Sequence, residues 1–135
     1  MRSFVTRRSS MLEEDRPEPV PVIELLAQLL ESVELLASPA EAQLHWLDCH
    51  GFPMQELILD LELCWPLFSE RLLDAGLIDH RRGVSLDRLV ARAIALVNPA
   101  HAPLFTEEQL NSAQEWADLR KQAALVAIDL RASLA

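Results

Sequence analysis

MQELILDLELCWPLFSERLLDAG, residues 54–76, decides the fold class. The run from Leu59 to Leu63 alternates between apolar and acidic residues, as a β-strand does, but the whole stretch is longer than an ordinary strand. Leu and Glu favour the helix, and no glycine interrupts the stretch before its last residue. We therefore predict a helix, and we expect Pro66 to kink or split it after Cys64 because proline removes a backbone donor.

On a helix, the apolar residues of this stretch fall on two sides. One side is expected to enter the core and comprises Leu57, Ile58, Leu61, Trp65, Phe68 and Leu72. Leu59 and Leu63 fall on the opposite side. A helix that is apolar on two sides is either central or also contacts a partner.

The residues before this stretch predict two helices. Apolar residues recur at spacings of three and four over residues 22–37, which is typical of an amphipathic helix. Ser38 is expected to cap a second helix, with Pro39 in its first turn, that runs to about His50. Gly51 can then take the left-handed conformation that ends a helix.

Three further helical segments are predicted after it. Ser85 is expected to cap a helix at residues 86–97. Thr106 should cap a short helical turn, and Ser112 should cap a long last helix whose apolar stripe begins at Trp116. The chain has no tyrosine and no Asn-Gly or Asp-Gly dipeptide, so nothing indicates a β-hairpin.

We therefore predict an all-α protein, a compact bundle of five or six helices. A length of 135 residues is typical of one domain, which we place at residues 22–135. Alternating prolines over residues 1–21 favour an extended tail before it.

Charge is distributed unevenly along the chain, whose net charge is -9. Residues 17–70 contain ten acids and no Lys or Arg, whereas residues 71–135 contain eight of each sign. The acids of this block therefore face water, the C-terminal half or another molecule. Direct binding of nucleic acid is disfavoured, since phosphate recognition needs clustered Lys and Arg.

We expect a cytoplasmic protein that does not enter membranes. No stretch approaches the roughly 20 consecutive apolar residues of a membrane span. The N-terminal arginines are followed by acids instead of an apolar core, so no export signal is predicted, and Met11 is an alternative start. Two cysteines without a disulfide framework fit a reducing compartment.

The cysteines and nearby histidines form one candidate metal or thiol site. The candidate ligands, which are residue types that bind zinc, are His45, Cys49, His50 and Cys64. Their spacing matches no common zinc module, and no glycine-rich turn accompanies a cysteine as a thiol enzyme would need. The simpler interpretation is that both cysteines pack in the core and both histidines lie near a helix end, so no cofactor is predicted.

The acids of residues 54–76 form the second candidate site. A solvated helix face is the simplest interpretation of these acids, and an acidic docking surface is the alternative. As a docking surface, we expect it to consist of four electrostatic contacts and two apolar anchors, namely Glu56, Asp60, Glu62 and Glu70 with Leu59 and Leu63.

Two segments, HWLDCHGFPMQELILDLE at residues 45–62 and PLFTEEQLNSAQEWADLRKQA at residues 103–123, resemble small acidic helical proteins of bacteria that accompany toxins as immunity partners. The resemblance implies a binding role and assigns no individual residue a function.

We therefore expect a non-enzymatic protein that docks residues 17–70 onto a basic partner protein, such as a toxin or effector. One alternative is a secretion chaperone, and another is an inhibitor that mimics nucleic acid. A third is a metal- or thiol-dependent protein centred on Cys49. A homo-oligomer formed through Leu59 and Leu63 is compatible with each.

Overall fold

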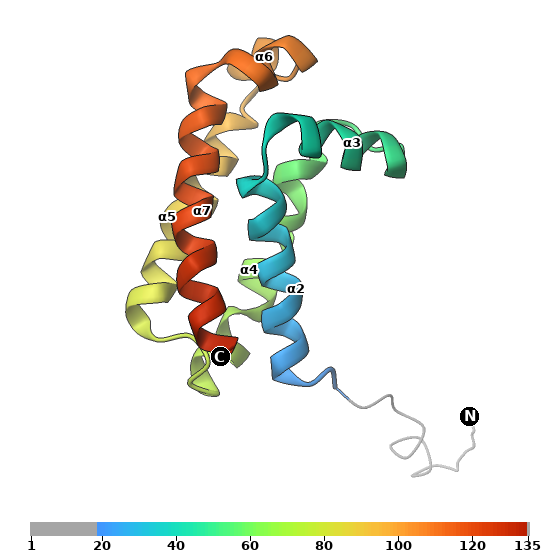
Figure 1. The fold of residues 1–135 in the computed structure, drawn as a ribbon. Helices are drawn as coiled ribbons and strands as arrows, with labels where there is room; N and C mark the ends of the chain where they lie inside the picture. Colours follow the sequence, from blue (N-terminus) through green and yellow to red (C-terminus); the bar gives the residue numbers. More distant parts are fainter. Residues whose placement is uncertain (1–18, 135) are drawn as a thin grey trace, which may run out of the picture.

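The computed structural model describes residues 19–134, and this range is helical throughout apart from short connections (Figure 1). The prediction of an all-α chain is confirmed for these residues, in which no β-strand occurs. Nearly all of the predicted tail lies outside the described residues. The elements are α2 (Val22–Ala37), α3 (Ala40–His50), α4 (Glu56–Asp74), α5 (His80–Leu96), the 3-10 helix η1 (Pro99–Leu104), α6 (Glu107–Ser112) and α7 (Gln114–Leu134).

Four long helices pack around one core. α2 lies against α4 and α7, and α5 lies against the same two helices. Successive long helices run in opposite directions, so each has two antiparallel neighbours (Figure 1). α3 lies across one end of the four helices, on the same end as α6 and η1 (Figure 1). The outer sides of the four long helices are thereby left facing solvent.

The stretch that decides the fold class forms one continuous helix, α4. Its predicted core side is buried, apart from the partly buried Phe68. Pro66 lies inside the helix without splitting it. Proline lacks the N–H that would bond the carbonyl of Glu62, and the exposed position of Pro66 keeps that part of the backbone near water.

Two of the predicted helix caps are wrong. The Ser38 hydroxyl donates to the carbonyl of Glu34, and the Ser112 hydroxyl donates to the carbonyl of Glu108, each at 2.8 Å. Both serines thus bond back to the helix that precedes them. They end α2 and α6 instead of starting α3 and α7.

The cap of α5 also differs from the prediction, whereas the cap of α6 is confirmed. α5 begins well before Ser85, because the carboxylate of Asp79 accepts from the backbone N–H of Arg82 at 2.8 Å. This hydrogen bond lowers the pKa of Asp79 by stabilising its charged form. At α6, the Thr106 hydroxyl accepts from the N–H of Gln109 at 3.1 Å, as predicted.

A fully buried glutamine joins α3 to α2 and α7. The Nε2 group of Gln43 donates to the carbonyls of Leu35 at 3.1 Å and Leu36 at 3.0 Å, near the end of α2. Its Oε1 atom accepts from Nε of Arg120 in α7 at 3.1 Å. Arg120 also donates to the carbonyl of Leu110 in α6. Gln43 and Arg120 thereby supply donors to the carbonyls of Leu36 and Leu110, near the ends of two helices, while the carbonyl of Leu35 also accepts from the N–H of Ser38 at 3.1 Å.

Gln43→Ala should lower the free energy of unfolding by about 2–4 kcal/mol, because it leaves the buried carbonyl of Leu36 without its side-chain donor and Nε of Arg120 without its acceptor. Urea denaturation followed by circular dichroism measures this loss. The matched control is Gln122→Ala on α7, whose amide bonds the exposed Arg92 and whose loss should cost under about 0.5 kcal/mol. Equal losses in the two variants would contradict a stabilising role of the Gln43 network.

Candidate functional site

The outer side of α4 carries an apolar pair framed by acids. Leu63 and Leu67 are each 66% exposed and lie one turn apart. Acids precede and follow the pair at spacings of three and four, so they share its face of the helix. We call this face the α4 ridge, and it consists of Glu56, Asp60, Leu63, Leu67, Glu70 and Asp74.

The α4 ridge contains most of the residues predicted to bind a partner. Glu62 does not belong to it, because neighbouring residues lie about 100 degrees apart around a helix and Glu62 is half-buried beside the ridge. Leu59 precedes Leu63 by four residues, but it is half-buried and is not part of the ridge. The prediction omitted Leu67, although its spacing of four from Leu63 was a signal that both share one face.

Asp60 is held against α2. The Ser32 hydroxyl donates to the carboxylate of Asp60, and the thiol of Cys64 lies 4.0 Å from its other oxygen. Ser32 is itself buried, with its Oγ atom 3.3 Å from the carbonyl of Gln28. Asp60 therefore links the α4 ridge to the surface of α2.

A depression of about 300 Å³ adjoins Asp60 between α2, α3 and α4. The ring of Trp46 forms part of its wall and lies 4.6 Å from the ring of His50 and 5.5 Å from that of Phe52, between centroids. Among the described residues, no basic side chain lines it. We call it the acidic depression, and its lining residues are Glu31, Ser32, Glu34, Leu35, Ser38, Trp46 and Asp60.

The basic residues of the described C-terminal part neutralise little of the acidic block. Among ion pairs formed between residues 19–134, one involves an acid of the block, Glu34, whose Oε2 atom lies 2.7 Å from Nη2 of Arg131. Arg71, the first basic residue after the block, donates to the carbonyl of Val20 at 2.7 Å instead. The acids of the α4 ridge are therefore not neutralised by these bases.

The four metal candidates do not come together. On the exposed side of α3, Nε2 of His45 lies 3.5 Å from Sγ of Cys49, and Nδ1 of His50 donates to the carbonyl of Trp46 at 2.8 Å. Within residues 19–134, no three His, Cys, Asp or Glu side chains are grouped so that they could hold a metal ion. In the same range, His45 has no other hydrogen-bond partner that could orient it as a catalytic base.

The prediction that both cysteines are buried is confirmed for Cys64 and wrong for Cys49. α3 crosses one end of the bundle and buries only the side that carries Gln43 and Leu47. Cys49 lies outside that narrow side and is exposed.

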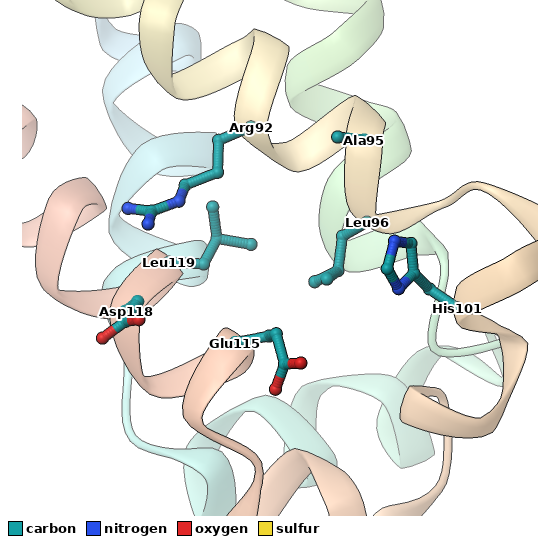
Figure 2. Close-up of a pocket in the computed structure, with 7 residues that line it drawn as sticks. All are labelled: Arg92, Ala95, Leu96, His101, Glu115, Asp118 and Leu119. Carbon is teal, nitrogen blue, oxygen red and sulfur yellow. The ribbon is translucent and has the colours of Figure 1, made fainter.

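A second depression, of about 200 Å³, lies between α5, η1 and α7 (Figure 2). Leu96 and Leu119 contribute apolar surface to it, whereas its charged groups come from α5 and α7. Two of these groups are already bonded, because Arg92 donates to Gln122 at 2.9 Å and Asp118 accepts from Gln114 at 2.7 Å. The depression carries both signs of charge and does not continue the acidic surface. Its lining residues are Arg92, Ala95, Leu96, His101, Glu115, Asp118 and Leu119.

Comparisons with protein-family models, with curated proteins and with solved structures found no match to this chain. In the part of the chain that the structure describes, no helix combines the length and the apolar composition needed to cross a membrane. The α4 ridge and the acidic depression are thus the surface features that bear on function.

The two thiols should differ in reactivity at neutral pH. Burial raises the pKa of the Cys64 thiol, and the carboxylate of Asp60 adds to this effect, while the bond to Ser32 opposes it. In native protein treated with Ellman's reagent, Cys64→Ser should retain a fast-reacting thiol, and Cys49→Ser should react slowly until denaturant is added.

The raised pKa of the Cys64 thiol also affects the stability of the protein. Because the folded protein has the higher Cys64 pKa, the contribution of the neutral thiol is complete below the pKa of the unfolded chain and is lost as the pH rises through the folded value. The free energy of unfolding should therefore fall over the alkaline range less steeply in Cys64→Ser than in Cys49→Ser. Identical reaction rates and pH profiles in the two variants would contradict the burial of Cys64.

Proposed function

We propose that this chain is a non-enzymatic, cytoplasmic binding protein whose α4 ridge docks onto a basic partner protein, as an immunity or antitoxin-like protein docks onto its toxin. The observation that supports this function best is the pair of exposed leucines, Leu63 and Leu67, set between acids on one helix face. Isolated exposed leucines are common, but a framed pair on one turn resembles the apolar centre and polar rim of an interface.

The two parts of the α4 ridge would have different roles. The leucines offer apolar area that a partner removes from water, which stabilises the complex. The acids attract a basic surface over a longer range, which speeds association and excludes acidic partners. Affinity and selectivity would thus come from neighbouring residues of one helix.

The acidic depression offers a place for a basic side chain of the same partner. Glu31, Asp60 and Trp46 are among the residues that line it. Carboxylates form charge-assisted hydrogen bonds with a guanidinium or ammonium group, and an aromatic face attracts the same cation. An Arg or Lys of the partner that enters here would set the orientation of the complex.

The same surface bears on the alternative functions. Leu63 and Leu67 at the centre of the α4 ridge favour a protein partner over mimicry of nucleic acid, because mimicry needs the charges and gains nothing from exposed leucines. A secretion chaperone would use the same kind of surface and differs in its partner, an exported effector. The identity of the captured partner separates these two.

Reversing the charge of the α4 ridge should abolish capture of the partner from cells of the source organism, measured by affinity capture with the full chain and quantitative mass spectrometry. Asp60 is left unchanged because Ser32 depends on it. The variant carries Glu56→Lys, Glu70→Lys and Asp74→Lys. The matched control reverses three exposed acids on α6 and α7, with Glu107→Lys, Glu108→Lys and Glu115→Lys. Equal capture by the two variants would exclude the α4 ridge as the docking surface.

Removing the leucines tests the apolar part separately. Leu63→Ala with Leu67→Ala should raise the Kd for the captured partner by about tenfold or more, because the complex buries less apolar area. Isothermal titration calorimetry measures this change. The control, Leu125→Ala with Ile128→Ala, removes side chains of similar exposure from α7 and should leave the Kd of each protomer unchanged. A Kd that both pairs alter equally would rule out a specific role of α4.

A further inference from the structure

α7 has an exposed apolar face of its own. Leu125 is 65% exposed and Ile128 is 59% exposed, and a spacing of three residues places them on one face of α7. Lys121 precedes Leu125 by four residues, and Asp129 follows it by four. The charges that flank this face are therefore of opposite sign, whereas those of the α4 ridge are all negative.

This order of charges is self-complementary. If two copies of α7 lie antiparallel across a two-fold axis at Leu125, each residue faces the residue at the same distance on the other side of the axis. Lys121 of one copy then faces Asp129 of the second copy, and the reverse pair forms as well. The ion pair to Arg81, 3.2 Å from Oδ2 of Asp129, leaves Oδ1 available for the lysine.

A depression adjoins Leu125 on the surface of α7. A shallow depression of about 400 Å³ is lined by Arg92, Asp118, Lys121, Gln122 and Leu125. Ile128 lies three residues after Leu125, and Gln122 lies three residues before it. The same two-fold axis therefore brings Ile128 of the second copy to the depression at Gln122.

We propose that this chain forms a homodimer through antiparallel packing of α7, with Leu125 at the centre and Ile128 of each copy in the depression of the other. The like charges of the α4 ridge would repel across a two-fold axis, so α7 is a better site for self-association than Leu59 and Leu63. The dimer leaves the α4 ridge free, and it does not depend on the function proposed above.

Sedimentation equilibrium of the full chain tests the dimer. The wild type should sediment as a dimer, and Leu125→Glu should sediment as a monomer. The control is Leu63→Glu, at a leucine of α4 with nearly the same exposure, and it should remain a dimer. Circular dichroism confirms that both variants are folded. A wild type that is monomeric up to millimolar concentration, or loss of the dimer only in Leu63→Glu, would overturn the proposal.

Exchange of the flanking charges tests the antiparallel arrangement. Lys121→Glu and Asp129→Lys should each weaken the dimer by about tenfold, because each turns two symmetric attractions into repulsions. Lys121→Glu combined with Asp129→Lys should restore it. Arg81→Gln removes only the ion pair within one chain and should leave the dimer intact. A double variant as weak as the single ones would show that Lys121 and Asp129 do not face each other.

Discussion

The hydrogen bonds of Gln43 are the constraint on which the position of α3 depends, at the end of the bundle that also carries α6 and η1. This one side chain binds two carbonyls in the last turn of α2 and the guanidinium of Arg120, which in turn reaches α6. Buried polar groups are costly without partners, so α3 is held across the end of the bundle in one position. That position brings Trp46 beside α2 and Asp60, and the acidic depression is the result.

The packing of four long helices determines which surfaces remain for binding. Each of α2, α4, α5 and α7 uses two sides for its neighbours and one for the core, so only the outer side is free. α4 and α7 both place exposed aliphatic pairs there, Leu63 with Leu67 and Leu125 with Ile128. The charges around the pairs differ, and this difference suits one helix to a basic partner and the other to a second copy of the chain.

Local sequence predicted helices more reliably than it predicted their ends. The periodicity of residues 22–37 defined α2, and the length and composition of residues 54–76 separated α4 from a strand. Serine caps were ambiguous because a hydroxyl can bond forward to a free N–H or back to a carbonyl of the preceding helix. Ser38 and Ser112 bond backward, whereas Thr106 bonds forward.

The sequence by itself determined the helical class, the buried side of α4 and the block of acids without basic residues. Only the tertiary structure decided that Cys49 is exposed, that Glu62 is half-buried and that Asp60 is bonded to Ser32. The reason is physical. Periodicity depends on the chain's own helical geometry, whereas exposure and side-chain partners depend on which helix packs against which, and that is set by contacts between residues far apart in the sequence.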